Sequence, residues 1–349
     1  MTRQYRLLGR TGLRVSRLAL GTMTFGEQRI GSHDWGSDEA TSRSVFERYL
    51  EWGGNFVDTA NRYTGGRSEE LLGRFIAETG SRDQVVLATK FAMPVDAGNP
   101  NLAGNGRKNI MASLDASLRR LGTDYVDLYW LHMWDQLTPV EEVMSTFDTL
   151  VRSGKVRAIG LSNTPAWYLT KGQLIAEQRG WERIAALQLE YSLVQRAIER
   201  EHVPAALDLG MGLVPWSPLA HGFLSGKYTR DDAGPSGEGR IDALRGLGFY
   251  RAPEDQDWTV LDAVRDIAKE TDRSPAQVAL NWVTNRPGVA ATLVGARTTT
   301  QLEENLAALD FELSQEQTAR LTELSEFDHG YPYSMFGHQA AGGDYTVSA

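Results

Sequence analysis

The chain has 349 residues, of which 41% are hydrophobic and 23% charged, so it can bury a large core as one barrel or as two ordinary domains. It contains no cysteine, which excludes disulfides, thiolate metal sites and cysteine nucleophiles. The net charge of −9 argues against a general affinity for nucleic acid or anionic membranes, so a bound phosphate group needs a local site.

The first residues, MTRQYRLLGRTGLRVSRLAL, are basic but contain no sustained apolar stretch, and nowhere do about 18 uncharged apolar residues follow one another. We therefore expect a cytoplasmic protein without a membrane partner. The sequence carries no signal for an oligomeric state.

Short apolar or β-branched runs alternate with segments of helical period along the chain. The predicted strands are Leu18–Gly21, Asn55–Asp58, Val85–Thr89, Tyr125–Leu131, Val156–Gly160, Ala185–Leu189, Gly212–Trp216 and Ala290–Val294. The predicted helices are Ser37–Trp52, Arg67–Glu78, Lys108–Leu121, Pro139–Ser153, Pro165–Glu177, His202–Leu209, Asp257–Glu270 and Thr299–Leu309. This repeat predicts an α/β fold, a (β/α)8 TIM barrel, more simply than the alternative of a doubly wound sheet.

Other segments depart from the plain repeat. Tyr5–Arg17 is predicted to form an N-terminal β-hairpin that closes the barrel floor, and Pro275–Arg286 an additional helix. Three long connections follow strands: Phe91–Gly106, His132–Thr138 and Ser217–Gln256. Loops that follow strands lie at the carboxyl-end face of a barrel, so we expect these three to frame the site.

We interpret residues 1–349 as a single domain with a barrel core at 5–325. The segment 327–349 is rich in Gly, Tyr, Phe and His and shows neither helical nor strand periodicity. Folding over the carboxyl-end face, binding to a neighbouring subunit and disorder all remain open for this tail.

Three titratable residues stand at the carboxyl ends of consecutive predicted strands: Asp58, Lys90 and His132, and Tyr63 follows Asp58 by five positions. In a barrel these side chains converge on one pocket. A tyrosine hydroxyl is a weak acid at neutral pH, and an adjacent ammonium stabilises its phenolate. Lys90 can supply that charge, Asp58 can keep Lys90 protonated, and His132 can orient a carbonyl oxygen. The set predicts a metal-free site that protonates a carbonyl.

Residues 5 to 325 also resemble the aldo-keto reductases in landmarks that follow in the order of that family: LALGTMTFG, GGNFVDTANRYTGGRSEELLGR, TKF, SLRRLGTDYVDLYWLH, SGKVRAIGLSN and LVGARTTTQLEENL. The run PWSPLAHGFLSGKY at 215–228 is similar to the bacterial branch that includes the potassium-channel β subunits. The resemblance places the family's catalytic residues on Asp58, Tyr63, Lys90 and His132.

The resemblance implies a nicotinamide cofactor. The residues implied at the nicotinamide are Gly21, Thr22, Met23 and Asp58 beneath it, Ser162, Asn163 and Gln188 at its carboxamide, and Trp216 stacked on its ring. The residues implied over the pyrophosphate are Ser217, Leu219, Gly222, Leu224, Ser225 and Lys227. The residues implied at the adenosine end are Gly295, Arg297, Gln301, Glu304 and Asn305.

The adenosine end departs from the best-known members, which carry Lys and Arg where Gly295 and Gln301 align. Arg297 is the remaining cation, and a guanidinium binds a 2′-phosphate bidentately. We therefore expect NADPH or NADP+ as the preferred cofactor, with NADH as a second possibility. No G-x-G-x-x-G follows the first strand, so a Rossmann dinucleotide site is not indicated.

The predicted function is an NADPH-dependent carbonyl reductase that interconverts an aldehyde or ketone and an alcohol. The alternatives are an NADP-linked alcohol or sugar dehydrogenase and a cofactor-sensing regulatory subunit. A metal-dependent hydrolase is disfavoured because the strand ends lack the several His and carboxylate ligands it requires. Candidates for an apolar substrate wall, each also compatible with a core or surface role, are Trp35, Phe91 and Trp134, with Tyr331 and Phe336 of the tail.

Overall fold

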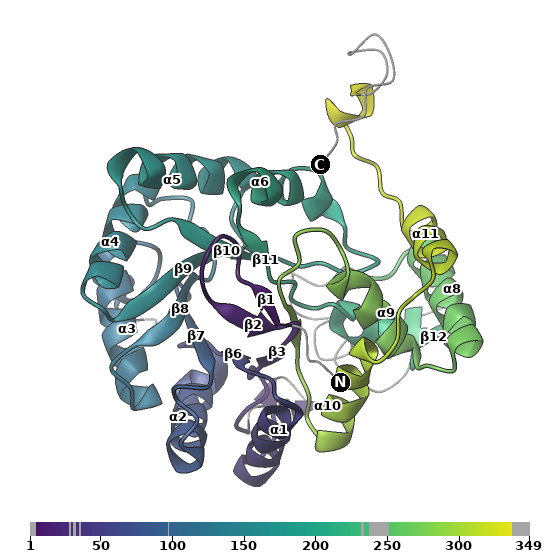
Figure 1. Ribbon diagram of the computed structural model, residues 1–349, viewed down its shortest axis with the longest axis horizontal. Helices are drawn as coiled ribbons and strands as arrows, with labels where there is room; N and C mark the ends of the chain where they lie inside the picture. The colour runs from purple at the N-terminus through teal and green to yellow at the C-terminus, as the bar shows by residue number, and fades with distance from the viewer. Residues whose placement is uncertain are drawn as a thin grey trace.

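The computed structural model describes residues 5–27, 29–30, 33–34, 36–96, 98–231, 234–236 and 251–336. Parallel strands stand in its centre and helices surround them (Figure 1). The barrel strands are β3 (Leu18–Gly21), β6 (Phe56–Asp58), β7 (Val86–Phe91), β8 (Val126–Leu131), β9 (Val156–Ser162), β10 (Ile184–Gln188), β11 (Gly212–Leu213) and β14 (Thr292–Val294).

The strand order shows a closed barrel. Strands β3, β6, β7, β8, β9, β10 and β11 are neighbours in chain order, and β14 lies beside β3. The two ends of this sheet meet where Leu213 of β11 pairs in parallel with Val289, just before β14. The (β/α)8 prediction is therefore confirmed, and the doubly wound alternative is wrong because such a sheet has two free edges.

Each predicted helix is present within two residues at its start, and the additional helix is present too. The helices are α1 (Glu39–Trp52), α2 (Arg67–Thr79), α3 (Arg107–Leu121), α4 (Val140–Arg152), α5 (Ala166–Arg179), α6 (His202–Leu209), α8 (Asp255–Thr271), α9 (Pro275–Thr284), α10 (Thr299–Leu306) and α11 (Gln315–Leu324). The sequence analysis missed α11, although Ser314 and Gln317 form a capping box at its start.

The N-terminal hairpin closes the amino-terminal end of the barrel. It pairs β1 (Tyr5–Leu7) with β2 (Arg14–Ser16) and lies across the strands in Figure 1. In the turn, the Arg10 backbone N–H donates to the carbonyl oxygen of Gly210 (3.0 Å). Gly9 has φ +58°, and a Cβ there would lie 2.3 Å from the carbonyl oxygen of Ala185, so this approach requires glycine.

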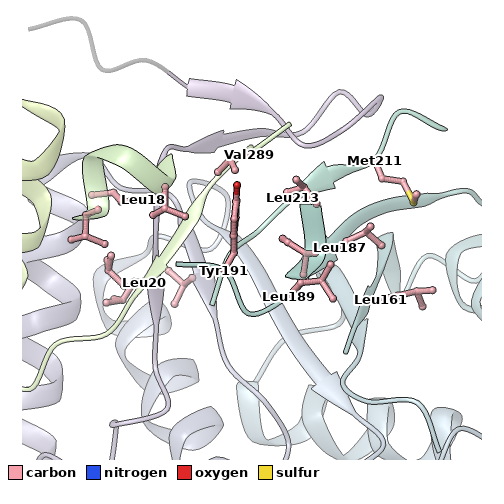
Figure 2. Packing of buried hydrophobic residues seen from close by; sticks show 14 of the residues in the cluster. Leu18, Leu20, Leu161, Leu187, Leu189, Tyr191, Met211, Leu213 and Val289 are labelled. Carbon is pink, nitrogen blue, oxygen red and sulfur yellow. The ribbon is translucent and has the colours of Figure 1, made fainter. Parts of the chain in front are cut away.

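Alternate residues of each strand divide the core into two layers. Leu18, Leu20, Leu161 and Leu187 point outward and pack under the helices, in the cluster that Figure 2 shows. The residues between them belong to a second cluster inside the barrel, which includes Ala19. This is the period of two that a strand imposes on its side chains.

The barrel interior combines alanines with larger side chains such as Phe56 and Leu128, and Trp130 is the largest of them. Trp130 of β8 is fully buried inside the barrel among Ala88, Ala158 and Ala186. Its ring occupies space that a side chain at Gly160 would need, because a Cβ there would lie 2.2 Å from the indole. Interior volume is therefore shared between one tryptophan and small neighbours.

The remaining short elements lie in the connections. The strands are β4 (Arg29–Ile30), β5 (His33–Asp34), β12 (Thr229–Asp231) and β13 (Gly234–Ser236). The 3₁₀ turns are η1 (Tyr63–Gly66), η2 (Pro100–Leu102), η3 (Ala197–Glu199), η4 (Ala220–Ser225), η5 (Ala307–Leu309) and η6 (Tyr333–Met335). No helix in the described ranges combines the length and apolarity needed to cross a membrane.

Part of the predicted tail is described and docks on the start of α6. The Arg200 guanidinium donates to the carbonyl oxygen of Asp328 (3.0 Å), and the Tyr333 hydroxyl donates to the Glu201 carboxylate. Residues 337–349 of the tail lie outside the described residues.

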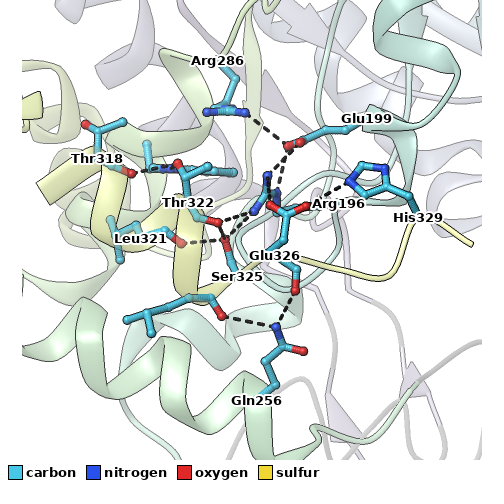
Figure 3. A network of polar contacts seen from close by, with 12 residues as sticks. Arg196, Glu199, Gln256, Arg286, Thr318, Leu321, Thr322, Ser325, Glu326 and His329 are labelled. Carbon is cyan, nitrogen blue, oxygen red and sulfur yellow. Dashed lines mark hydrogen bonds and ion pairs between the residues drawn. The ribbon is translucent and has the colours of Figure 1, made fainter. Parts of the chain in front are cut away.

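A buried ion-pair network joins the loop after β10 to α9 and α11 (Figure 3). Arg196, only 4% exposed, donates from Nε (3.0 Å) and Nη2 (2.8 Å) to the carboxylate of Glu199. Its Nη1 donates to the Thr322 carbonyl (2.7 Å) and to Ser325 Oγ (2.9 Å). Arg286 also lies 3.5 Å from Glu199, so this carboxylate is shared by two guanidinium groups, and Arg196 lies 3.6 Å from a second carboxylate, that of Glu326.

We expect Glu199→Ala to lower the free energy of unfolding by roughly 3–5 kcal/mol, because it leaves the buried Arg196 charge without its main partner. Urea denaturation at pH 7 measures the loss. Glu78→Ala is the matched control, since it breaks the exposed pair with Arg43 and should cost less than about 1 kcal/mol. Equal losses in the two variants would contradict a stabilising role for the network.

Candidate active site

The site residues point into the barrel mouth because of strand periodicity. Phe56, Ala88 and Ala186 belong to the interior cluster, and Asp58, Lys90 and Gln188 follow them by two positions each. Side chains two apart on a strand share a face, so these three polar groups stand above the interior layer at the carboxyl ends of β6, β7 and β10. The same parity places Ser162 two positions after Gly160 at the end of β9.

Lys90 is the centre of the site. Its side chain is fully buried, and its three ammonium protons meet three acceptors: the Asp58 carboxylate, the carbonyl oxygen of Thr59 (2.9 Å) and the hydroxyl oxygen of Tyr63 (3.0 Å). An ammonium has three donors, so every one is satisfied. The Tyr63 oxygen accepts here, which leaves its own proton free to be donated elsewhere.

The Lys90 ammonium stays charged although it is buried. Burial alone would lower the pKa of Lys90, but the negative charge of Asp58 and the hydrogen bonds to Asp58 and Tyr63 outweigh burial and raise it above its ordinary value. Asp58 is held on its other side by the Gln188 amide, whose Nε2 donates to Asp58 Oδ1 (3.0 Å). The geometry therefore supports a charged Lys90–Asp58 pair beside the phenol.

The turn that carries Tyr63 is held from several sides. Three left-handed residues, Thr64, Gly65 and Gly66, lead from Tyr63 into α2. The Thr64 hydroxyl donates to the carbonyl oxygen of Phe25 (2.9 Å). Gly66 lies against the side chain of Arg120, which would come within 3.0 Å of a Cβ there. The phenol is therefore presented by a backbone that has little freedom to move.

Ser68 is a hub that the sequence analysis did not identify. Its hydroxyl lies within 3.0 Å of the hydroxyls of Thr22 and Thr59 and donates to the carbonyl oxygen of Thr22. Serine at the start of a helix is common, so no sequence signal marked this one. It links the first turn of α2 to the ends of β3 and β6.

His132 stands beside Tyr63, with ring centroids 6.0 Å apart in an edge-to-face arrangement. Burial, with the positive charges of Lys90 and Arg62 nearby, lowers the pKa of His132 to about 3. The ring is therefore neutral at ordinary pH. Its Nδ1 is buried and has no hydrogen-bond partner among the described residues, which is the state expected of a group that awaits a ligand atom.

The groups expected at the nicotinamide lie together at the mouth. Asn163 Nδ2 donates to the His132 carbonyl (3.0 Å) and to Ser162 Oγ (3.0 Å), and its Oδ1 accepts from the Trp216 indole (3.1 Å). Both amide protons of Asn163 are thus engaged, so its structural effect is to orient Trp216. The Ser162 hydroxyl donates to no described residue and the Gln188 Oε1 accepts from none, so the two groups fit a carboxamide.

The residues expected beneath the ring also lie at this edge. Gly21 pairs with Asp58, and the Thr22 backbone N–H donates to the Asp58 carbonyl (2.9 Å). Met23 follows and is partly exposed. Gly21, Thr22 and Met23 therefore lie beside Asp58 at the carboxyl-end edge of the barrel, where the resemblance places the nicotinamide ring.

The segment after Trp216 forms a strained turn. Ser217, Ala220 and His221 have φ between +48° and +57°, a region that non-glycine residues rarely adopt. Ser217 Oγ accepts from the His221 backbone N–H (3.0 Å), and the Lys227 ammonium lies against Gly222. Of the other residues expected over a pyrophosphate, Leu224 is buried, and Leu219 and Ser225 are partly exposed. The Lys227 ammonium beside the backbone of Gly222, which has no side chain, is an arrangement that can bind an anionic group.

The residues expected at the adenosine end gather around the start of α10. The Arg297 backbone N–H donates to Gln301 Oε1 (3.0 Å), and Asn305 Nδ2 donates to the Gly295 carbonyl (3.3 Å). Glu304 is exposed on the same helix. The Arg297 guanidinium is exposed and makes no ion pair with any described residue. It is therefore available to a phosphate.

The candidates for a substrate wall differ in their exposure. Phe91 is fully buried and packs on Tyr129 (5.0 Å) and Phe147 under the helices, so its proposed place in the pocket is corrected. The reason is that successive side chains of a strand point to opposite faces: Lys90 points into the barrel, so Phe91 points outward. Trp134 is partly exposed at the mouth, Tyr331 and Phe336 are exposed on the tail, and Trp35 lies outside the described residues.

A model of the aldo/keto reductase family matches residues 17–326 of this chain. The site therefore has the setting of that enzyme class: polar groups at the carboxyl-end face of a (β/α)8 barrel.

The curated relatives of this chain are also oxidoreductases. The chain is 39% identical to an uncharacterized oxidoreductase, YrpG, of Bacillus subtilis, over 92% of this chain and 95% of the relative. It is 36% identical to norsolorinic acid reductase of Aspergillus flavus, over 93% and 81%. It is 33% identical to an aryl-alcohol dehydrogenase [NADP(+)] of Phanerodontia chrysosporium, over 96% and 88%. The chain belongs to the aldo/keto reductase family and is an NAD(P)H-dependent oxidoreductase.

The lowered pKa of His132 predicts a pH effect on stability. Between the ordinary value of 6.5 and about 3, the unfolded chain binds a proton at this position that the folded chain does not, so stability falls as the pH falls. We expect the wild type to lose about 1 kcal/mol more free energy of unfolding than His132→Gln between pH 7.5 and pH 5.5. Urea denaturation at both pH values measures this, and parallel pH dependences would refute it.

Proposed function

We propose that this protein is an NADPH-dependent carbonyl reductase that converts aryl aldehydes or ketones to alcohols reversibly, with Tyr63 as the proton donor. The observation that carries the proposal is the arrangement at Lys90, whose ammonium donates to Asp58, Thr59 and Tyr63 together. That arrangement leaves the Tyr63 proton directed away from Lys90 and toward the open mouth.

The chain's own residues provide the acid. When a carbonyl oxygen lies at the mouth, Tyr63 can donate its proton to that oxygen as negative charge develops there. The Lys90 ammonium, 3.0 Å from the phenol oxygen, stabilises the phenolate that remains. Asp58 keeps Lys90 charged, and neutral His132 beside Tyr63 supplies a further polar contact for the substrate oxygen. In the reverse direction Tyr63 takes the alcohol proton.

A bound nicotinamide supplies the hydride for the carbonyl carbon or accepts it from the alcohol. Ser162, Gln188 and Trp216 would hold it at the mouth, because they offer a donor, an acceptor and an oriented indole face. Lys227 and Arg297 would hold its phosphates. Fixed placement of both reactants is the second large contribution expected to the rate.

The class of substrate is inferred from the relatives and from the mouth. One relative is named for an aryl alcohol and NADP(+), and a partly exposed tryptophan, Trp134, follows His132 by two residues. Both support an aromatic carbonyl.

We expect Tyr63→Phe to lose several orders of magnitude in turnover while it still binds NADPH, because the substitution removes the acidic hydroxyl and leaves the residues expected at the cofactor unchanged. NADPH oxidation at 340 nm with benzaldehyde measures turnover, and quenching of tryptophan fluorescence measures cofactor binding. Tyr125→Phe, which alters a tyrosine at the amino-terminal start of β8, is the control and should stay near wild type. Turnover near wild type in Tyr63→Phe would end the assignment.

We expect Arg297→Ala to weaken NADPH binding by roughly 10- to 100-fold and NADH binding little, because the guanidinium loses its hydrogen bonds to a 2′-phosphate. Arg297→Lys should fall between, since lysine keeps the charge without the planar fork. Fluorescence titration with each cofactor gives the dissociation constants. Equal losses for the two cofactors would show that Arg297 does not contact the phosphate.

A further inference from the structure

Large exposed apolar side chains lie in the connections that follow three neighbouring strands, β7, β8 and β9. Val95, Met133, Leu137 and Trp167 are all exposed, and they belong to the loops after β7 and β8 and to the first turn of α5, which follows β9. We call these four residues the apolar rim. The other exposed large apolar residues in the described ranges lie on the hairpin, on α5 and α6, and on the tail. Apolar groups gathered at one edge of a site usually mark a binding surface.

The apolar rim is continuous with the candidate active site. Met133 directly follows His132, and the Trp134 backbone N–H donates to the Asn163 carbonyl (3.4 Å). On the other side, Arg62, next to Tyr63, donates to the carbonyl oxygen of Pro94 (2.5 Å), which precedes Val95. The loops that carry the rim are therefore tied to residues next to Tyr63 and His132.

Trp167 is the aromatic member of the rim. Its ring centroid lies 5.5 Å from that of Trp134 and 5.6 Å from that of Tyr168, both nearly perpendicular to it. These edge-to-face contacts fix the orientation of the indole, while 58% of the residue stays exposed. The Tyr168 hydroxyl donates to the Thr138 carbonyl (3.2 Å) and so ties α5 to the loop after β8.

The loops beneath the rim are held in place by Asp135. Its carboxylate accepts from the backbone N–H groups of Asn105 (2.8 Å), Leu137 (3.0 Å) and Thr138 (2.9 Å). One half-buried side chain thus joins the loop after β7 to the loop after β8. A surface that is ordered in advance costs little to bind.

We propose that the apolar rim is an outer substrate subsite, in which Trp167 packs on the distal rings of a fused-ring aromatic carbonyl compound. This subsite rests on the proposed carbonyl reduction and deepens it by favouring extended aromatic substrates over single-ring ones. The proposal requires that a one-ring aldehyde held at Tyr63 leaves Trp167 uncovered and that a linear three-ring compound reaches it.

The test compares benzaldehyde with anthracene-2-carbaldehyde, which present the same reacting group on one ring and on three. Trp167→Ala is expected to raise KM for the three-ring aldehyde roughly three- to tenfold, with KM for benzaldehyde and kcat for both nearly unchanged. Trp167→Phe should restore most of the affinity for the three-ring aldehyde, because it keeps an aromatic face.

Leu174→Ala is the matched control. Leu174 is 46% exposed on the same face of α5, seven residues and so roughly 10 Å farther from the mouth. It should leave both KM values unchanged. Equal KM changes for the two aldehydes in Trp167→Ala, or none, would overturn the subsite.

A binding measurement separates this subsite from the proposed function. If wild-type protein turned over neither aldehyde, the reductase assignment would fail, and fluorescence titration with anthracene-2-methanol would still test the rim. Weaker binding of this alcohol to Trp167→Ala than to Leu174→Ala would support the subsite, and equal binding would refute it. The alternative is that a second copy of the chain packs on the rim, and sedimentation of both variants tests it. A changed oligomeric state with unchanged binding of the alcohol would assign the rim to that contact.

Discussion

The buried ammonium of Lys90 is the constraint on which the rest of the site depends. A charge inside a protein is tolerated only when it is paired and its donors are satisfied, and the three acceptors here come from β6, from the backbone just after it and from the turn before α2. The register of β6 against β7 and the path of the strained Tyr63 turn must therefore be kept together. A shift of one residue in either strand would turn Asp58 or Lys90 out of the mouth.

The same periodicity that satisfies Lys90 builds the cofactor side. The interior residues of the strands form a buried layer that contains the large rings of Phe56 and Trp130, and the polar groups begin directly above this layer. Asn163 then links His132, Ser162 and Trp216, which come from three different strand ends. The proposed reductase thus has its acid and its cofactor face fixed by one connected set of hydrogen bonds rather than by separate loops.

Charge is distributed in a way that suits this arrangement. The chain is acidic overall, with a net charge of −9, yet Lys227 and Arg297 stand at the two positions where phosphates of a dinucleotide are expected. On the opposite side of the mouth, the loops after β7 to β9 carry the four exposed apolar side chains of the apolar rim. A charged cofactor and an apolar substrate would therefore meet different surfaces on the way to the same phenol.

The sequence by itself determined the eight strands, their helices and the four residues Asp58, Tyr63, Lys90 and His132 at the strand ends, because strand and helix periods and caps are local properties. Even the outward position of Phe91 follows from the inward position of Lys90, although the sequence analysis did not use that parity. Only the tertiary structure decided that Asn163 orients Trp216, that Ser68 links the start of α2 to the ends of β3 and β6, and that Glu199 joins two arginines. It also decided which apolar loop residues stay exposed. Those contacts join groups far apart in the chain, and their partners are chosen by barrel closure and packing.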